Sequence, residues 1–466
     1  MVKKMMVYNW KSWWRCLHKN NHFVIKFGIS LLLVALAFRL LYSSSSSRSS
    51  HFSPLPDSNS LENSLLISDT SQENTIQIPP QENGRESTYG EGKCNLFIGD
   101  WVPNQDEPLY TNWTCNFIED HQNCMMNGRP DDGYLYWRWN PRGCELPRLD
   151  PERFLDLMRN KTWGFIGDSI SRNHVQSFLC LLSKVKFDKA AVIVAYAKRN
   201  SLNNWNNMHV EKAIEVYHDE SYKFRRWVFP KHNFTVSVIW SPFLAEAVIF
   251  EDINGVSTSE IELQLDILDK NWTDPYKSLD YMIFSAGKWF IKSAIYYENN
   301  TILGCHYCPK RNFTELGFNF AYRKVTRNFF NYIIDSNHKG MIFYRTSTPD
   351  HFEGGEWFSG GTCKRKVPAK EGEFELNQLD NILREIELEE FEKASAKAYE
   401  NGVNLKLLDV NPLSLMRPDG HPGPYRFFQP FGKDKNASVI SDCLHWCLPG
   451  PIDSWNDILV EMVVNG

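Results

Sequence analysis

A serine at a predicted strand-to-helix turn is the residue of this sequence best placed to do chemistry. Ser169 stands in the stretch GFIGDSISRN, where an apolar run ends in Gly-Asp-Ser and polar residues then open a helix. A serine hydroxyl becomes a nucleophile when a base removes its proton, and free N–H groups at a helix N-terminus stabilise a developing oxyanion. By itself, this common tripeptide is better explained by a helix cap formed by Asp168 or Ser169.

Two residues of the same predicted helix lie one turn beyond the serine. Arg172 and Asn173 follow Ser169 by three and four residues, so both can point back over the helix N-terminus and donate to an oxyanion. His174 is a further candidate base, but its place in the helix is unsuited to Ser169. Packing or a local hydrogen bond explains this histidine better.

A base with an orienting acid is found near the C-terminus, in the segment SDCLHWCLPGPIDSW. Asp442 stands three residues before His445. At this spacing an aspartate can accept a hydrogen bond from one imidazole nitrogen and leave the other free to face a serine. Alone the pattern is a weak signal, because loop aspartates and core histidines are common, and Asp419 with His421 is a rival pair.

Alternating strand and helix patterns supply the scaffold from Lys161 onward. Short apolar runs predict strands at 162–167, 279–287, 340–352 and 405–410. Apolar residues at helical spacing predict helices at 171–185, around 322–333 and from 379 to a break at Gly402. This alternation indicates an α/β fold with a mainly parallel sheet covered on both faces. Ligands bind beyond the carboxyl ends of such strands, which is where Ser169 falls.

The combination of motifs resembles the plant trichome birefringence-like family, in which a domain of unknown function is joined to a PC-esterase-like domain. The resemblance runs from about Cys94 to Val464 and includes CNLFIGDWVP, GDSISRN, RTSTPDHFEGGEW, RPDGHPGPY and DCLHWCLPGPIDSWNDIL. It implies an SGNH/GDSL-like three-layer α/β/α domain with a disulfide-rich N-terminal lobe packed on it. It also implies a Golgi O-acetyltransferase acting on cell-wall polysaccharides.

Carried over by matching motif, the resemblance implies a catalytic triad of Ser169, His445 and Asp442 that works by double displacement. Ser169 would take an acetyl group from a donor, and a sugar hydroxyl would then take it from the acetyl-serine. His445 would move the proton, Asp442 would orient His445, and Arg172 and Asn173 would help hold the oxyanion. This chemistry needs no metal and no bound cofactor, but it needs an acetyl donor, either acetyl-CoA or another carrier.

One block departs from the pattern of GDSL hydrolases, which use a separate glycine and asparagine as oxyanion donors. The stretch SAGKWF has Gly287 but no asparagine. Relatives have a bulky aromatic pair after this glycine, where the present chain has Lys288, Trp289 and Phe290. The difference would allow a shift in acceptor recognition.

Ten of the eleven cysteines follow an apolar N-terminal run, and an even number in an oxidising compartment predicts disulfides. The spacings Cys305-x-x-Cys308 and Cys443-x-x-x-Cys447 are loosely compatible with zinc, which a secretory compartment disfavours. The resemblance implies the pairs Cys94–Cys144, Cys115–Cys180, Cys124–Cys447 and Cys363–Cys443. The last two would tether the Asp442/His445 turn from both sides, while Cys305 and Cys308 are left over.

The N-terminal region predicts a membrane anchor. Phe27 to Phe38 carries no charge, and with its flanks the apolar run at 23–42 is long enough to cross a bilayer. Basic residues before it favour a type II orientation, with a cleaved signal peptide as the alternative. We expect a cytosolic tail at 1–22, a signal anchor at 23–42, a Ser/Pro-rich flexible stem at 43–90, a Cys/Trp-rich lobe at 91–160 and a catalytic domain at 161–466, in the Golgi lumen.

Glycosylation sequons support a lumenal location. Seven N-x-[ST] acceptors are present, at Asn112, Asn160, Asn233, Asn271, Asn299, Asn312 and Asn436. The formal net charge of −5, from 51 basic and 56 acidic residues, gives no indication of a nucleic-acid partner.

Two other functions remain compatible with these residues. A carbohydrate acetylesterase would use the same triad and differ only in whether water or a sugar hydroxyl reaches the acyl-serine. A non-catalytic polysaccharide binder would rely on aromatic residues, of which Trp289, Trp357 and Trp446 either stack on a glycan or lie in the core. The sequence looks closest to the branch associated with xyloglucan and mannan, with xylan and pectin as alternative acceptors.

Overall fold

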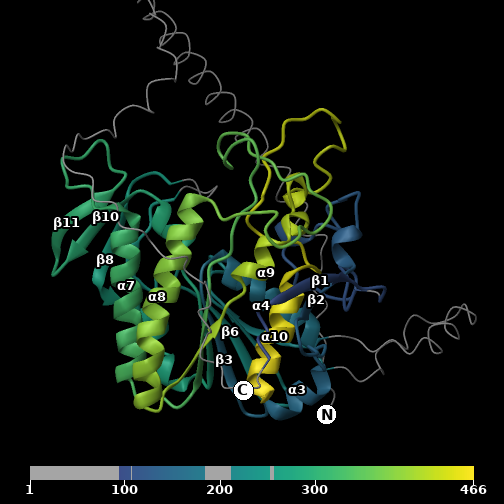
Figure 1. The fold of residues 1–466 in the computed structure, drawn as a ribbon, viewed down its shortest axis with the longest axis horizontal. Helices are drawn as coiled ribbons and strands as arrows, with labels where there is room; N and C mark the ends of the chain where they lie inside the picture. Colours follow the sequence, from purple (N-terminus) through teal and green to yellow (C-terminus); the bar gives the residue numbers. More distant parts are fainter. Residues whose placement is uncertain (1–93, 107, 184–210, 252–256, 466) are drawn as a thin grey trace, which may run out of the picture. The chain divides into compact units, whose positions relative to one another are not determined.

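The computed structural model describes residues 94–106, 108–183, 211–251 and 257–465 (Figure 1). The predicted tail, anchor and stem lie outside these ranges. Among the described residues, no helix has both the length and the apolar character needed to cross a membrane.

A seven-stranded sheet organises the described chain. Its order is β13 (Asn404–Leu408), β12 (Met341–Arg345), β9 (Tyr281–Phe284), β3 (Thr162–Gly167), β6 (Phe234–Trp240), β5 (Arg225–Phe229) and β4 (Ile214–His218). The strands from β13 to β6 are parallel, and β5 and β4 extend the edge in antiparallel fashion. The prediction of a mainly parallel sheet is therefore confirmed. The third predicted strand is shorter than expected, because the polar, proline-containing segment after Arg345 forms a loop.

The sequence patterns did not predict β4, β5 and β6 of this sheet, nor the strands outside it. Beyond the large sheet, a second sheet has the order β11 (Thr301–His306), β10 (Ala294–Glu298), β8 (Ile261–Leu268) and β7 (Ala245–Val248). A hairpin in the N-terminal lobe pairs β1 (Gly99–Pro103) with β2 (Trp137–Pro141). This lobe packs on the rest of the fold, since the indole of Trp101 donates to the carbonyl of Leu413 at 2.8 Å.

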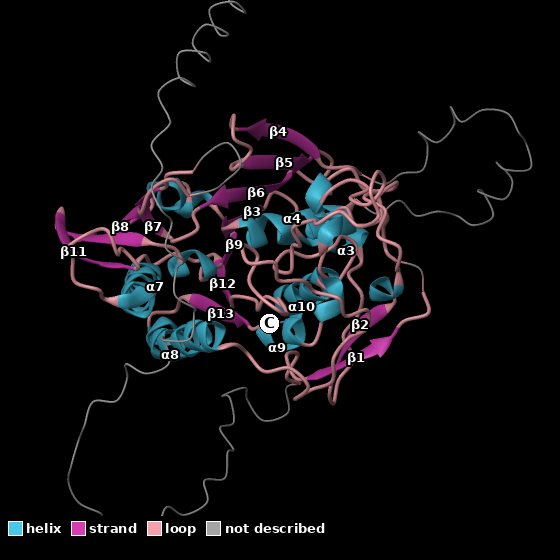
Figure 2. Ribbon diagram, turned by 90° about the horizontal axis from the view of Figure 1, so that it is seen from above, coloured by secondary structure: helices cyan, strands magenta, loops and turns pink. Residues whose placement is uncertain are grey.

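Helices lie on both sides of the large sheet (Figure 2). The α-helices are α3 (Pro151–Leu157), α4 (Ser169–Leu182), α6 (Lys270–Thr273), α7 (Gly317–Asp335), α8 (Gln378–Glu400), α9 (Asn411–Leu415) and α10 (Ile452–Asn465). Short 3-10 helices are η2 (Asp120–Gln122), η3 (Gly133–Leu135), η5 (Tyr276–Ser278), η6 (Lys288–Ile291), η7 (Pro418–Gly420) and η8 (Pro424–Arg426).

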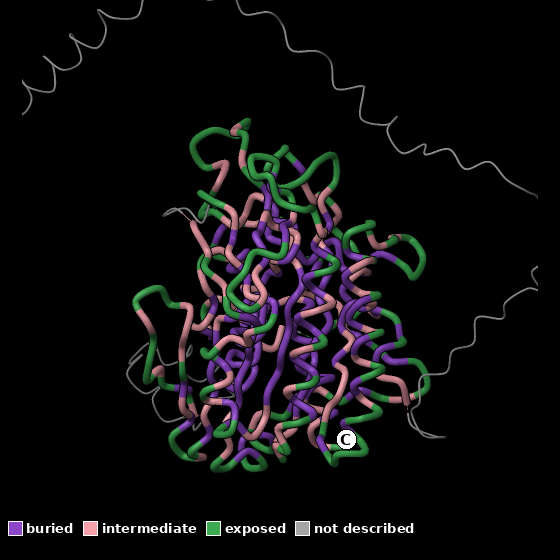
Figure 3. The backbone as a smooth tube through the Cα atoms, turned by 90° about the vertical axis from the view of Figure 1, so that its left-hand side faces the viewer, coloured by how far each residue is buried: buried purple, intermediate pink, exposed green. Residues whose placement is uncertain are grey.

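Alternating strand residues bury the two faces of the sheet in two separate cores. In β3, Phe165 packs with α4 and α10, whereas the next residue, Ile166, packs with α7 and α8 on the other face. Phe343 and Ile342 of β12 divide in the same way. Buried backbone accordingly runs through the centre of the molecule (Figure 3). The expectation of a sheet covered on both faces is confirmed.

A buried carboxyl group bridges the α7/α8 layer to the loop after β12. Glu387 of α8 accepts hydrogen bonds from the Tyr322 hydroxyl at 2.6 Å and from the Ser347 backbone N–H at 3.0 Å. Burial raises the pKa of Glu387 to about 7, although these hydrogen bonds act to lower it. The folded protein therefore binds a proton here that the unfolded chain, with an ordinary glutamate pKa of about 4.3, has released.

The contribution of Glu387 to stability should fall as pH rises from about 4 to 7, because the proton on Glu387 is lost only from the folded state in that window. Glu387→Gln removes this ionisation, so the change in unfolding free energy between acidic and neutral pH should differ from that of the wild-type protein by about 3 kcal/mol. Urea unfolding at pH 5 and pH 7.5 measures the effect. The variant keeps the contributions of the other buried groups, such as Asp453, whose pKa burial raises to about 6.

The exposed Glu389 on the same helix supplies the matched control. Glu389→Gln should keep the slope of the wild-type protein. If Glu387→Gln also kept that slope, Glu387 would not be the group that releases the proton.

Candidate active site

The turn between β3 and α4 presents Ser169 at the carboxyl end of the sheet. Gly167 has φ 151°, and a Cβ at this position would collide with the carbonyl oxygen of Ser285, so no larger residue fits. Asp168 is the N-cap of α4, and its side chain accepts from the Ile170 N–H at 2.9 Å. The capping role therefore belongs to Asp168, and the hydroxyl of Ser169 is left for another partner.

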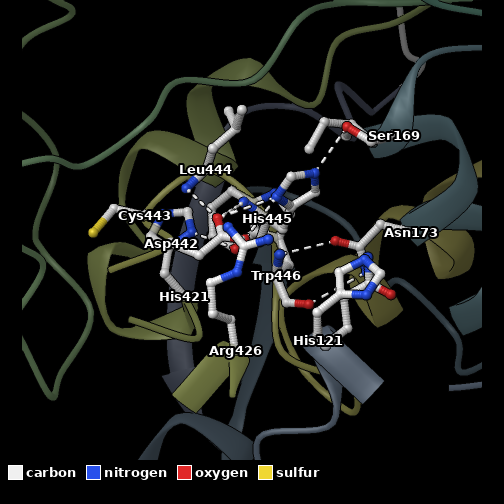
Figure 4. A network of polar contacts seen from close by, with 12 residues as sticks. His121, Ser169, Asn173, His421, Arg426, Asp442, Cys443, Leu444, His445 and Trp446 are labelled. Carbon is white, nitrogen blue, oxygen red and sulfur yellow. Dashed lines mark hydrogen bonds and ion pairs between the residues drawn. The ribbon is translucent and has the colours of Figure 1, made fainter. Parts of the chain in front are cut away.

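That partner is His445, which the chain brings back from 276 residues away (Figure 4). Nε2 of His445 lies 2.8 Å from Oγ of Ser169. Nδ1 of the same ring lies 2.9 Å from Oδ2 of Asp442 and 3.1 Å from Oδ1. Because a carboxylate only accepts, Nδ1–H donates to Asp442 and Nε2 is left to accept from the serine hydroxyl. The three predicted triad residues are therefore aligned as nucleophile, base and orienting acid.

Asp442 is held as a buried carboxylate. Its Oδ1 also accepts from the backbone N–H groups of Leu444 at 3.2 Å and His445 at 3.0 Å. Burial acts to raise the pKa of Asp442, but the charge of His445, its hydrogen bond and the nearby Arg426 outweigh burial and hold the pKa well below its ordinary value. Asp442 is thus ionised throughout the neutral range.

Disulfides fix the loop that carries Asp442 and His445. The structure has Cys363–Cys443 and Cys124–Cys447 on the two sides of the turn. The other two implied pairs, Cys94–Cys144 and Cys115–Cys180, are also present. Cys305 and Cys308 pair with each other. These two cysteines and Glu315 form the one cluster with metal-like spacing among the described residues, and their disulfide leaves no thiolate to bind zinc.

Asn173 has a different task from the one predicted. Its Oδ1 accepts from the Trp446 backbone N–H at 2.8 Å, and its Nδ2 donates to the Trp446 carbonyl at 3.3 Å. The side chain is fully buried. The expectation that Asn173 donates to an oxyanion is wrong, because both ends of its amide bind the backbone beside His445. Asn173 instead positions the loop that carries the base.

Arg172 and Gly287 are the other two residues predicted to hold an oxyanion. The guanidinium of Arg172 sits 3.8 Å from the Glu119 carboxylate and 5.5 Å from the centre of the Trp240 ring. Gly287 is buried with φ 156°, and a Cβ there would approach the Cβ of Ser347 to 2.9 Å. Packing alone explains this glycine, and both oxyanion roles stay predictions.

The three residues after Gly287 lie in different environments. Lys288 is half-buried and ion-paired with Asp350 at 2.6 Å and with Asp380, so its charge is matched by two carboxylates. Phe290 is buried in the core. Trp289 is half-buried and packs edge-on against Trp240 at 5.5 Å.

The remaining tryptophans divide between core and surface. Trp446 is fully buried, so it cannot stack on a glycan. Trp357 is 53% exposed on the loop after β12 and is available to solvent.

The rival pair from the sequence is not a base with its acid. The carboxylate of Asp419 binds the guanidinium of Arg417 at 2.7 Å. The ring of His421 donates from Nδ1 to the backbone carbonyl of His445 at 2.7 Å. His174 is fully buried and packs edge-on against Phe165, in agreement with the packing role expected for it.

Sequence reasoning missed a histidine from the N-terminal lobe. The ring of His121 lies edge-on to His445, with ring centres 6.1 Å apart. Burial and the neighbouring His445 lower the pKa of His121 to about 4, so it is neutral at neutral pH. Its position in η2, inside a cysteine-rich segment, offered no signal of this proximity. The N-terminal lobe therefore forms one wall of the site.

The predicted sequons lie at the surface. Six of the seven asparagines are exposed, and Asn112 is half-buried. Their glycosylation stays a prediction.

The sequence matches two protein-family models and several known proteins. Residues 146–462 match the "GDSL/SGNH-like Acyl-Esterase family found in Pmr5 and Cas1p", called PC-Esterase, and residues 92–145 match the "PMR5 N terminal Domain". The chain is 49% identical to Protein trichome birefringence-like 23 of Arabidopsis thaliana, over 96% of each chain. This chain belongs to the trichome birefringence-like family. The predicted resemblance is confirmed.

Some relatives of this trichome birefringence-like protein carry names that state an activity. Xyloglucan O-acetyltransferase 2 of Populus trichocarpa is 42% identical over 80% of this chain and 82% of the relative. Xyloglucan O-acetyltransferase 1 of Arabidopsis thaliana is 38% identical over 94% of this chain and 95% of the relative.

Proposed function

We propose that this protein is an O-acetyltransferase that moves an acetyl group through an acetyl-Ser169 intermediate onto a hydroxyl of a hemicellulose. The observation that carries the proposal is the alignment of Ser169, His445 and Asp442, with 2.8 Å between hydroxyl and imidazole and 2.9 Å between imidazole and carboxylate. Xyloglucan is the favoured acceptor, because relatives that cover most of the chain are named for acetylating it.

The reaction proceeds in two halves with one proton shuttle. In the first half, Nε2 of His445 takes the proton of Ser169 as Oγ attacks the acetyl carbonyl carbon, and the proton then goes to the donor's leaving group as its bond breaks. In the second half, a sugar hydroxyl gives its proton to His445 as its oxygen attacks the same carbon. The proton returns to Oγ when the ester to Ser169 breaks.

The proposal also covers the acetyl donor, the residues that contact the glycan acceptor and the location of the protein in the cell. The donor is acetyl-CoA or another acetyl carrier, and no bound cofactor is needed. Trp357 and Trp289 are the proposed stacking surfaces for the glycan, because sugar rings pack on the faces of accessible aromatic side chains. Five disulfides and exposed sequons support a location in the Golgi lumen, with residues 23–42 as a type II anchor.

A transfer assay tests the function. The full-length protein is incubated with acetyl-CoA or 4-nitrophenyl acetate as donor and with unacetylated xyloglucan oligosaccharides. We expect acetylated oligosaccharides in the mass spectrum, in larger amounts than with xylan or mannan oligosaccharides. Acetate release from an acetylated polymer without any transfer would instead assign the second candidate, a carbohydrate acetylesterase with the same triad.

A further inference from the structure

Two buried histidines, His351 and His421, contact each other, and the second contacts the backbone of the loop that carries His445. His351, in the loop after β12, is 4% exposed, and His421, after η7, is 3% exposed. Nδ1 of His351 lies 2.7 Å from Nε2 of His421. The outer nitrogens both face backbone carbonyls: Nε2 of His351 is 2.9 Å from the oxygen of Leu415, and Nδ1 of His421 is 2.7 Å from that of His445. Figure 4 shows His421 beside His445.

The number of ring N–H groups that these contacts require indicates that the two histidines together carry a positive charge. A carbonyl oxygen only accepts hydrogen bonds, so each outer nitrogen must carry a hydrogen. Two neutral imidazoles have only two ring N–H groups between them, and the two carbonyls use both. The inner nitrogens would then face each other with two lone pairs at 2.7 Å. A third proton between the rings turns this repulsion into a hydrogen bond and makes the pair a monocation.

We propose that His351 and His421 share one proton as a buried monocation, and that this pair positions His445 for acyl transfer through its backbone carbonyl. The pair itself does not touch the reacting atoms. The proposal deepens the proposed function, because it rests on His445 acting as the base.

Charged groups from several elements face the pair. Carboxylates that favour the cation are Asp350 beside His351, Asp419 of η7 and Asp442 in the catalytic loop. Lys288 and Arg129 oppose it, and Arg129 also donates to the backbone carbonyl of His421 at 2.9 Å.

One neighbouring ring also favours the shared proton. Trp446 stacks on the His421 ring, with ring centres 4.1 Å apart, and an aromatic face attracts a cation.

The shared proton is held less firmly than that of an ordinary imidazolium. Burial lowers the pKa of His351, and burial together with the neighbouring His351 lowers that of His421. The pair therefore keeps its proton on the acidic side and releases it as pH rises. Release restores the repulsion between the inner nitrogens and loosens the anchor on His445. Activity should consequently decline as pH rises through the lowered pKa of the pair, for a reason separate from the triad.

The variant His351→Gln separates this charge from a neutral hydrogen bond. A glutamine amide can donate to Nε2 of a neutral His421, and it does not titrate. The rate of Ser169 acetylation by 4-nitrophenyl acetate should fall about tenfold per pH unit above the pair's pKa in the wild-type protein. This decline should vanish in His351→Gln, while His351→Leu, which has no donor, should be slow at every pH.

A control variant and a direct measurement of histidine protonation complete the test. His338 is a half-buried histidine bound to the Leu279 carbonyl before β9, and His338→Gln should keep the wild-type pH profile. NMR of protein labelled with ¹⁵N-histidine should show two coupled rings that lose one proton together, and in His351→Gln the remaining His421 ring should stay neutral. This reading needs no activity, so it distinguishes failure of the proposed function from failure of the pair.

Two outcomes would overturn the proposal. One is a decline in activity with rising pH that is the same in His351→Gln and in the wild-type protein. The other is a pair of rings that NMR finds neutral at every pH at which the protein is folded.

Discussion

Replacing Ser169 by alanine is expected to lower acetyl transfer by on the order of 10⁴- to 10⁶-fold while the fold is preserved. The loss follows because Ser169→Ala removes the oxygen that must form the acyl bond, and the hydroxyl at 2.8 Å from His445 has no substitute in the site. The fold should survive because Asp168, not Ser169, caps α4. Alanine is also well tolerated within a helix.

Intact-protein mass after brief exposure to the acetyl donor measures this directly. The wild-type protein should gain one acetyl group that is lost again on addition of acceptor oligosaccharide, and Ser169→Ala should gain none. Ser259 is an exposed serine on another segment, and Ser259→Ala should behave like the wild-type protein. Acetyl transfer by Ser169→Ala at the wild-type rate would rule out the acyl-serine route.

The second large effect is expected for Asp442→Asn, at about 10⁴-fold in turnover. The asparagine oxygen can still accept from the backbone N–H groups of Leu444 and His445, so the turn should keep its shape. What is lost is the carboxylate that selects Nδ1–H on His445 and stabilises the imidazolium that forms during each half-reaction. The variant therefore tests electrostatics and tautomer, not loop geometry.

The same substitution should change stability in acid. Because the folded pKa of Asp442 lies below its ordinary value, its ionisation stabilises the fold above about pH 4, and this contribution is lost as pH falls. Asp442→Asn should remove that part of the acid-side decline.

Turnover and unfolding curves of Asp442→Asn are compared with those of Asp434→Asn, an exposed carboxylate on the preceding loop. The control should match the wild-type protein in both. Turnover within tenfold of wild type for Asp442→Asn would show that His445 is oriented by something other than this carboxylate.

Local patterns in the sequence were sufficient for part of the scaffold. The strand at 162–167 and the helices that became α4, α7 and α8 were predicted from periodicity, because each buries a continuous apolar face. The strands β4, β7 and β11 were missed. Their residues are mostly exposed or half-buried, so no apolar run or clean alternation marks them. Such edge strands depend on pairing with a neighbour that the local sequence does not specify.

Residue type and spacing determined which side chains can perform the chemistry. Serine after a glycine-aspartate turn, and aspartate three residues before histidine, are patterns that follow from hydrogen-bonding reach alone. Only the tertiary structure decided that these two segments meet, that Asp168 takes the cap and that Asn173 holds the loop. The sequence could not distinguish an Asn173 amide facing an oxyanion from one facing a peptide bond 273 residues away. Nor could it predict that His421 pairs with His351, 70 residues earlier, instead of with the adjacent Asp419. The physical reason is that capping and periodicity act within a few residues, whereas the partner of a buried polar group is set by the packing of distant segments.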